Sequence, residues 1–347
     1  MPATTHNERI AIFLPNWVGD AVMFTPALRA IRQRHPSAHV TLFGRPAPIA
    51  TLTPNPWSDE ILTAPQGVLA AIKLLRRRRF DLAILGPNSF RSAFIARSCA
   101  SRVAGFARDG RGFLLSEGLA PPRDATGELK IISALDYYLL LAERIGCGTS
   151  DKRMELFVDQ ADERRTDELL RSSGAASDAP LVLLNPGASF GSSKMYPPER
   201  FAQVADELVA RRQVQIIINA GPAEAEIAQA VAAAMSHKPL LNLAAVGNSL
   251  GLLKAVTRRC RLMITNDTGP RHIAAALNVP VVAIFGSTHP TWSANYFDKE
   301  RIVRVDVPCG PCQQKLCRLP GPGFHVCMRS IAPATVVAAA LDLLGTP

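Results

Sequence analysis

The sequence is poor in aromatic side chains and contains no long apolar run. Phe, Trp and Tyr make up 6% of its 347 residues. No stretch reaches the roughly 18 uncharged apolar residues that a transmembrane helix needs, so we exclude such a helix. The first residues, MPATTHNERIAIF, lack the basic start and apolar core of a signal peptide, and we expect a cytoplasmic protein. With 48% apolar and 20% charged residues, the composition predicts a soluble globular chain and excludes disorder, collagen and a coiled coil.

Acidic side chains are scarce relative to basic ones. The chain has 39 Lys and Arg against 29 Asp and Glu, a net charge of +10. Residues 1–150 hold 18 basic and 11 acidic side chains (+7), and residues 151–347 hold 21 and 18 (+3). A basic first half suits nucleic acid, an anionic membrane surface or a phosphorylated substrate, although a basic protein without such a partner remains the alternative. We expect no nucleic acid, because zinc-finger, RRM and KH patterns are absent.

Short apolar runs alternate with helix-like segments from end to end. Strands are predicted at Arg9–Leu14, Val40–Phe43, Phe80–Leu85, Arg102–Gly105, Leu181–Leu184, Val214–Asn219, Leu262–Thr265 and Val281–Phe285. Helices are predicted at Pro26–Arg34, Val68–Arg78, Ser89–Cys99, Leu129–Ile145, Glu199–Arg211, Ala223–Met235, Pro270–Leu277 and Pro333–Leu344. Nearly continuous apolar strands are typical of parallel sheets covered by helices on both faces.

A polar segment rich in small residues, RSSGAASDAP at Arg171–Pro180, has the composition of a linker. We therefore predict two doubly wound α/β domains, residues 1–172 and 173–347, with a ligand cleft between them. In such sheets, ligands bind outside the carboxyl ends of the strands. The loops that follow the strands are therefore where functional residues are expected.

The loop after the first strand, PNWVGD at residues 15–20, is the first such candidate. It is no dinucleotide fingerprint, because G-x-G-x-x-G is absent. Gly19 allows a tight turn, and Asp20 follows it at the mouth of the expected cleft. Asp20 is a candidate general base for an acceptor hydroxyl. The alternative is a carboxylate that serves only the dipole of the following helix.

The loop NPGASFGSSK at residues 185–194 combines small residues with one cation. Its backbone amides and hydroxyls, Ser189 among them, could cradle a phosphate, and Lys194 would add a mobile positive charge. It does not match the Walker A pattern. A solvated Gly/Ser loop is the alternative.

The element NDTGPRH at residues 266–272 follows a predicted strand and begins a helix. Asp267 or Thr268 can cap that helix, which starts near Gly269. The free amides at a helix N-terminus attract anions, and His272 in the first turn could donate to a phosphate oxygen. A well-capped helix with a structural histidine is the alternative.

Several weaker candidates follow other strands. Glu224 and Glu226 lie after the strand at Val214–Asn219, where a carboxylate could hold a ribose hydroxyl, although acids are ordinary at helix starts. The run at residues 76–79 could touch anionic lipid headgroups or simply be solvated. The candidates to bind an anionic acceptor are Asn88, Ser89, Arg91, Arg108 and Arg111.

Four of the seven cysteines lie close together in the sequence, at Cys309, Cys312, Cys317 and Cys327. Four thiols are enough for a tetrahedral structural zinc site. Their spacing does not contain two C-x2-C knuckles, however, so free thiols in a reducing compartment are the alternative. No other metal site is predicted.

Taken together, the motifs NWVGDAVMFTPALRAI, LGPNSFRSA, NPGASFGSSKMYPPERFA and TNDTGPRHIAAALNVPVVAIFGST resemble the ADP-heptose–lipopolysaccharide heptosyltransferases of glycosyltransferase family 9, most closely the heptosyltransferase II group. The resemblance covers nearly the whole chain. It implies a GT-B fold, with an acceptor-binding N-terminal and an ADP-sugar-binding C-terminal Rossmann-like domain. It also implies an inverting glycosyltransferase that needs no metal cofactor and acts in lipopolysaccharide core biosynthesis.

The resemblance implies a heptose transfer from ADP-L-glycero-D-manno-heptose to the heptosyl-Kdo-lipid A inner core. Asp20 would be the catalytic base and Lys194 the pyrophosphate lysine. The donor would also contact Ser189, Asp267, Thr268, Gly269, His272 and an acid at Glu224 or Glu226. The lipid acceptor implies peripheral contact with the cytoplasmic face of the inner membrane. A family 9 enzyme with another sugar or acceptor, a sugar-nucleotide epimerase and a non-enzymatic binding module are the alternatives.

Overall fold

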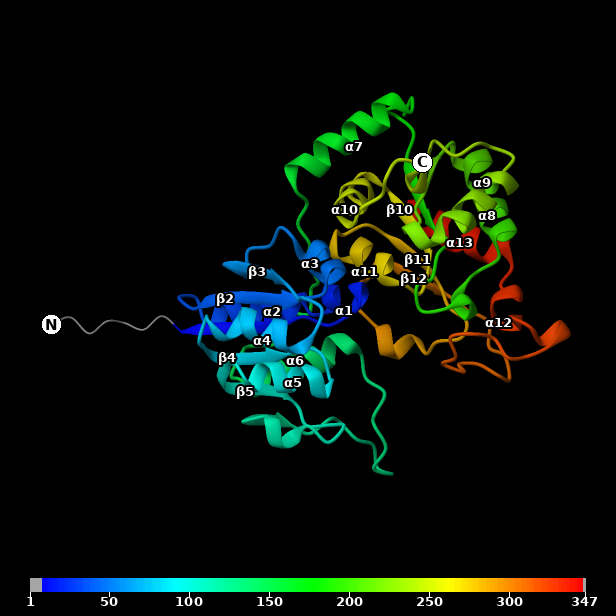
Figure 1. Ribbon diagram of the computed structural model, residues 1–347. Coiled ribbons are helices and arrows are strands. Elements are labelled where there is room, and N and C mark those ends of the chain that lie inside the picture. The colour runs from blue at the N-terminus through cyan, green and yellow to red at the C-terminus, as the bar shows by residue number, and fades with distance from the viewer. Residues whose placement is uncertain (1–7, 346–347) are drawn as a thin grey trace. The chain divides into compact units, whose positions relative to one another are not determined.

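The computed structural model describes residues 8–345 of the chain and divides it into two compact units (Figure 1). The first contains the described chain up to Leu156 together with Thr291–Tyr296, and the second contains Phe157–Pro290 and Phe297 onwards. The prediction about a signal peptide involves residues 1–7, which lie outside the described residues. Among residues 8–345, no helix has both the length and the apolar character to cross a membrane.

The first unit is built on a six-stranded parallel sheet in the order β3-β2-β1-β4-β5-β6. Figure 1 shows β3, β2, β4 and β5 following one another across its blue and cyan part. The strands are β1 (Arg9–Phe13), β2 (His39–Gly44), β3 (Glu60–Thr63), β4 (Phe80–Leu85), β5 (Ala100–Phe106) and β6 (Glu117–Leu119). The helices are α1 (Val18–Met23), α2 (Thr25–Arg34), α3 (Pro46–Leu52), α4 (Val68–Arg76), α5 (Phe90–Arg97) and α6 (Ala134–Arg144).

The second unit repeats this topology, with the sheet order β12-β11-β10-β7-β8-β9 and all pairs parallel. The strands are β7 (Leu181–Asn185), β8 (Gln215–Ile218), β9 (Leu241–Asn242), β10 (Leu262–Asn266), β11 (Val281–Ile284) and β12 (Glu300–Val303). The helices are α7 (Gln160–Ser172), α8 (Pro198–Arg212), α9 (Ala225–Ala234), α10 (Leu250–Arg259), α11 (Gly269–Ala276), α12 (Val326–Arg329) and α13 (Pro333–Leu344). The predicted class, two Rossmann-like doubly wound units, is confirmed.

Apolar side chains of the central strands bind the helices to each sheet. In the first unit, Phe13 and Leu85 lie in one buried cluster with Leu75 of α4 and Ile95 of α5. In the second unit, the residues that join β7, β8 and β10 to α8, α9 and α13 include Leu184, Ile218, Ile264, Phe201, Val231 and Val337. At roughly 1.5–3 kcal/mol for each large apolar side chain removed from water, these clusters fix the strand ends that carry the loops.

The predicted domain boundary at 172/173 differs from the division in the structure, which comes after Leu156. The segment interpreted as a linker ends α7 and leads into β7, and Gly174 has the left-handed φ of +74° common at a helix terminus. Helix α7 belongs to the second unit because Glu163 pairs with Arg258 and Arg259 of α10. The short Thr291–Tyr296 segment belongs to the first unit.

Candidate functional site

In each sheet, the strand order reverses its direction between two central strands. The reversal lies between β1 and β4 in the first unit and between β7 and β10 in the second. Neighbouring loops diverge at such a point and leave a crevice for a ligand. The loops singled out from the sequence follow β1, β4, β7 and β10, so they lie at the two reversal points.

Buried amides hold the loops after β7 and β10 together. Asn185 Nδ2 donates to Thr265 Oγ1 at 3.0 Å and to Thr268 Oγ1 at 3.1 Å. Asn266 Nδ2 donates to the Pro186 carbonyl at 2.7 Å, and its Oδ1 accepts from the Tyr196 amide at 3.1 Å. Asn185 and Asn266 are 2% and 0% exposed. Sequence reasoning did not single out these amides, although each of them directly follows a predicted strand and is the last residue of the observed one.

Lys194 and Asp267 form the centre of the second unit's site. Lys194 Nζ donates to Asp267 Oδ2 at 2.6 Å and to the Asp267 carbonyl at 3.0 Å. Thr288 Oγ1 donates to the same Oδ2 at 2.8 Å, and Arg271 NH1 lies 3.3 Å from Oδ1. Burial alone would raise the pKa of Asp267, but Lys194, Arg271 and these hydrogen bonds lower it to about 2. Asp267 is therefore a permanent anion between two cations.

Arg271 extends this cluster to the edge of the sheet. Its guanidinium is fully buried and makes a bidentate pair with Glu300 of β12, with Nε at 2.7 Å and NH2 at 2.6 Å from the carboxylate. Two cations, Lys194 and Arg271, thus face two anions, Asp267 and Glu300. The cluster is close to neutral, and its buried charges are paired as burial requires.

His272 lies in the first turn of α11 and is 3% exposed. Burial and the neighbouring Arg271 lower the pKa of His272 to about 3. The imidazole is therefore neutral across the physiological range. It retains one N–H donor, but it brings no positive charge to the helix N-terminus.

Two acids were considered after β8, and the structure distinguishes them. Glu224 Oε2 accepts from the Gly221 amide at 3.2 Å, and its Oε1 is buried without a hydrogen-bond partner among the described residues. The carboxylate packs so closely on Gly187 that a Cβ at that position would overlap it. Glu226 is exposed on α9. Glu224 therefore lies against the phosphate-loop candidate, and Glu226 faces solvent.

Ser189 is exposed in the same loop, between Gly187 and Lys194. Thr268 is the residue before α11, and its side chain does not cap the helix. Pro270 lies in the first turn, where its missing N–H costs nothing. Helix α11 thus begins at Gly269, where the sequence predicted its start.

In the first unit, Asp20 lies in the first turn of α1 and is half-buried. Burial raises the pKa of Tyr138, and the negative charge of Asp20 raises it further. The loops after β1 and β4 approach each other closely here, because Gly86 N–H donates to the Phe13 carbonyl at 2.9 Å. A Cβ at Gly86 would lie 2.8 Å from Phe13 O and from Pro15 Cδ, so this position requires glycine.

Arg111 is fully buried, in contrast to the expectation that it meets an external anion. Its guanidinium donates to the Phe106, Pro87 and Ser89 carbonyls at 3.0, 2.7 and 3.2 Å and to Asn88 Oδ1 at 2.9 Å. The side chain therefore acts on the loop after β4 and holds its shape. Ser89 caps α5 by accepting from the Ser92 amide.

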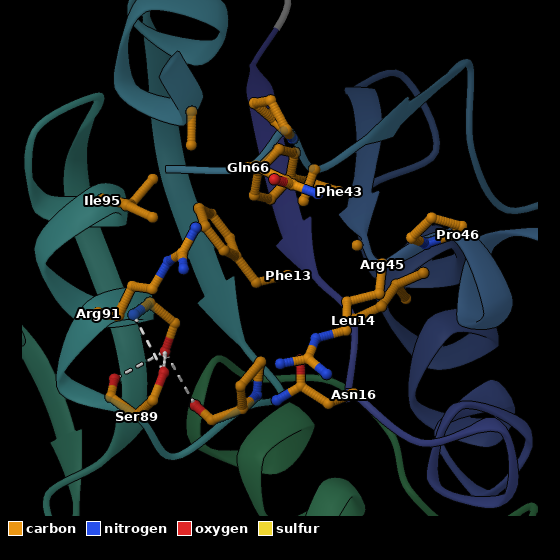
Figure 2. Close-up of a pocket in the computed structure, with 16 residues that line it drawn as sticks. Phe13, Leu14, Asn16, Phe43, Arg45, Pro46, Gln66, Ser89, Arg91 and Ile95 are labelled. Atoms are coloured by element: carbon orange, nitrogen blue, oxygen red, sulfur yellow. Dashed lines mark hydrogen bonds between the residues drawn. The ribbon is translucent and has the colours of Figure 1, made fainter. Parts of the chain in front are cut away.

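A pocket of about 480 Å³ opens at the carboxyl ends of β1, β2 and β4. Its floor includes Phe13 and Phe43, and Figure 2 shows Arg91 and Arg45 entering it from opposite sides. Neither guanidinium forms an ion pair or hydrogen bond with the described residues. Ser89 and Arg91 line the pocket, whereas Asn88, Arg108 and Arg111 do not. Arg45 was not singled out from the sequence.

The cysteine segment forms no metal centre in this structure. Among residues 8–345, no group of three or more His, Cys, Asp or Glu side chains is arranged to hold a metal ion. All seven thiols are free; Cys327 is buried, Cys309 is exposed, and Cys312 and Cys317 are half-buried. The zinc site named as one possibility is not indicated by these side chains and stays a prediction.

Comparisons with known proteins agree with this arrangement. The family description "Glycosyltransferase family 9 (heptosyltransferase)" matches residues 68–321. A lipooligosaccharide heptosyltransferase 2 of Campylobacter jejuni is 27% identical over 98% of this chain and 100% of its own length. The lipopolysaccharide heptosyltransferase 2 of Escherichia coli K12 is 25% identical over 86% of this chain and 88% of its own.

Two solved structures have the same fold. The family 9 glycosyltransferase of Veillonella parvula superposes with a TM-score of 0.83 at 24% identity, covering 97% of both chains. The E. coli ADP-heptose LPS heptosyltransferase II gives 0.78 at 24% identity, covering 97% of this chain and 98% of its own. The expected GT-B class is thereby confirmed. Because the family description spans most of the sequence, the chain belongs to glycosyltransferase family 9, the heptosyltransferases, and is a glycosyltransferase.

Proposed function

We propose that this chain transfers L-glycero-D-manno-heptose from its ADP-activated form to the heptosyl-Kdo-lipid A inner core of lipopolysaccharide. The observation that carries the proposal is the Lys194–Asp267 pair beside the N-terminus of α11, at the reversal point of the second sheet. That place combines an ammonium group with free helix amides, which suits a diphosphate. The relatives named above are heptosyltransferases according to their names.

The donor's diphosphate is proposed to lie against Lys194, Ser189 and the first amides of α11. Lys194 has three N–H donors, and two oxygens of Asp267, one of the carboxylate and one of the main chain, accept from it. Asp267 would orient the ammonium rather than touch the anion, because two negative groups repel. Thr268, Gly269 and neutral His272 would donate further hydrogen bonds. Glu224, with its unpartnered Oε1, would accept from a ribose hydroxyl.

The reaction follows as a single displacement that inverts the anomeric centre. Asp20 would take the proton of the attacking acceptor hydroxyl as the new C–O bond forms. The bond between the anomeric carbon and the diphosphate oxygen breaks, and ADP leaves with the electron pair. Lys194 and the α11 amides would stabilise the charge that grows on ADP, which is often the largest catalytic contribution. No step needs a metal ion.

The acceptor is proposed to use the first unit's pocket. Its apolar floor suits the CH face of a sugar ring, and the uncompensated Arg45 and Arg91 suit phosphate or carboxylate groups. Arg111, with Asn88, would keep the loop after β4 in shape rather than contact the acceptor. Arg108 remains a candidate contact outside the pocket.

We also propose peripheral contact with the cytoplasmic face of the inner membrane. A surface formed by α4 and the residues after it combines Leu69, which is 81% exposed, with Lys73, Arg76, Arg77 and Arg79. Arg78 takes no part, because it pairs with Glu60 at 2.6 Å. Binding to phosphatidylglycerol vesicles, but not to phosphatidylcholine vesicles, would support this contact, and an R76Q/R77Q variant should bind more weakly.

Nucleotide release tests the proposed reaction. The protein is mixed with ADP-heptose, with and without deacylated heptosyl-Kdo-lipid A, and ADP is followed over time. ADP release that depends on the acceptor supports the proposal. ADP binding without release would reject this acceptor and favour another glycan, and release without any acceptor would favour an epimerase or hydrolase. Transfer that persists in excess EDTA would agree with metal-free chemistry.

A further inference from the structure

The segment that carries the cysteines runs along the Lys194 loop and is hydrogen-bonded to it. The Ser193 amide donates to the Lys315 carbonyl at 3.1 Å, and Ser193 Oγ donates to the Gln314 carbonyl. Ser193 Oγ also lies 3.0 Å from Ser287 Oγ, and the Gln313 amide donates to the Ser287 carbonyl at 2.8 Å. These bonds connect the residue next to Lys194 with a segment more than 100 positions further along the chain.

The contact between the Lys194 loop and residues 313–315 is so close that larger side chains would not fit there. Ser193 and Ser287 are 2% and 1% exposed, so their hydroxyls have no solvent to replace a lost partner. A Cβ at Gly191 would overlap the Lys315 carbonyl. The main chain of Gln313–Lys315 therefore forms one wall of the Lys194 loop, and we name these three residues the brace.

The brace also brings a second ammonium group to the loop. Lys194 Nζ lies 4.9 Å from the centre of the Phe190 ring, and Lys315 Nζ lies 6.0 Å from the same centre. Lys315 is exposed, and its ammonium has neither an ion pair nor a hydrogen bond within the part of the chain that the structure describes. Lys194, in contrast, is paired with Asp267.

The charges of the second unit's site show why a second ammonium matters. Lys194 and Arg271 are balanced by Asp267 and Glu300, and His272 is neutral. A nucleoside diphosphate carries at least two negative charges near neutral pH. The buried cluster cannot neutralise them alone, and Lys315 is a cation beside the loop that is not already compensated.

We propose that the brace is a working part of the nucleotide site: its main chain positions the Lys194 loop through Ser193, and Lys315 binds the diphosphate. This inference rests on the proposed function, because it assumes a nucleoside diphosphate at the Lys194 loop. It gives the cysteine-containing segment a role in binding that requires no metal. Ser193 is then a positioning residue, and Lys315 contacts the ligand.

ADP is the probe for Lys315, and calorimetry gives its dissociation constant. We expect K315Q to weaken ADP binding by about 1.5-fold to fivefold, the range for one exposed ion contact, and to affect AMP less. K315R should retain most of the affinity. K238Q is the matched control, because Lys238 is an exposed lysine of the same unit outside the loop and the brace. Equal ADP affinities in K315Q and the unsubstituted protein, or an equal loss in K238Q, would overturn the role of Lys315.

Hydrogen exchange tests the brace without any ligand. The S193A variant loses two hydroxyl contacts. Exchange should therefore become faster at the main-chain amide of position 193 and at the amide of Gln313. Exchange at the amides of the buried strand β8 should not change. The donor KM should rise more than kcat falls, since a displaced loop first weakens binding. Unchanged exchange would refute the brace.

The outcomes separate this inference from the proposed function. If the unsubstituted protein fails to bind ADP, the proposed function itself is wrong. If it binds ADP normally and K315Q and S193A change neither ADP affinity nor exchange, only this inference is rejected.

Discussion

The D267N substitution removes one of the two carboxylates that balance Lys194 and Arg271 in the second unit's site. Arg271 keeps Glu300 at 2.6 Å, but Lys194 loses the carboxylate that lies 2.6 Å from its ammonium. The Lys194 side chain is 12% exposed, so solvent compensates for little of the lost charge. Removing one member of a buried pair typically costs about 3–5 kcal/mol, and we expect about 3 kcal/mol for D267N because Arg271 remains paired.

The pKa of Asp267 gives a second measure of the same interaction. Its pKa is about 2 in the folded chain, against an ordinary value of 3.8. A difference of nearly two units corresponds to about 2 kcal/mol, an order-of-magnitude value. Because the folded-state pKa is the lower one, this stabilisation is complete above about pH 5 and is lost as the pH falls toward 2. D267N should lack this part of the acid sensitivity.

Urea unfolding with two probes can separate the two units. The three tryptophans, Trp17, Trp57 and Trp292, all belong to the first unit, so fluorescence follows that unit and serves as an internal control. Far-UV circular dichroism follows both. At pH 7, D267N should shift the circular-dichroism transition of the second unit to a lower urea concentration. The fluorescence transition of the first unit should stay unchanged. A double-mutant cycle with K194M should give a coupling of about 2 kcal/mol or more. An unshifted transition, or a coupling near zero, would refute the reasoning.

Three further substitutions test other parts of the site. D20N should lower the transfer rate about 10²–10⁴-fold by removing the general base, while calorimetry finds ADP affinity unchanged; near-normal turnover would exclude Asp20 as the base. His272 has a folded pKa near 3, below its ordinary 6.5, so the protein should lose about 2 kcal/mol of stability as the pH falls from 6.5 to 5. Unfolding of H272Q should lack that loss, and an equal loss in both proteins would contradict it. G187A should push the Glu224 carboxylate aside and weaken ADP binding, and equal ADP affinities would show that Glu224 does not contact the nucleotide.

Continuous apolar strands were predictable from sequence, and edge strands were not. β4 matched its predicted bounds, because FDLAIL is buried almost throughout. β12, with the sequence ERIV and two exposed positions, has no pattern that separates it from a loop. It forms because β11 offers a free edge, and this depends on the rest of the sheet. Helix α7 was missed for a related reason, since Thr166 is its only buried residue among those described.

In the site, too, some features could be predicted from nearby residues, whereas others depend on contacts between distant parts of the chain. Loop chemistry after a strand is local, so Asp20, Lys194 and the α11 start could be selected from spacing and from the family resemblance. Their partners depend on contacts between distant elements: Glu300 reaches Arg271 from the edge strand, and Thr288 reaches Asp267 from the loop after β11. Arg111 was expected to bind an external anion because an arginine in a loop is usually exposed to solvent. Its burial depends on the packing of distant segments, which the local sequence does not reveal.

The charge of the second unit's site follows from these long-range pairs and changes what its residues can do. From the sequence alone, Lys194 and His272 count as two groups ready to meet phosphate. In the structure, Asp267 compensates Lys194 and burial keeps His272 neutral, so the site is ordered but close to uncharged. Preorganised dipoles and a compensated lysine can stabilise the charge that develops on a leaving group. An exposed cation would add attraction for the free nucleotide, which is the role proposed for Lys315 beside Phe190.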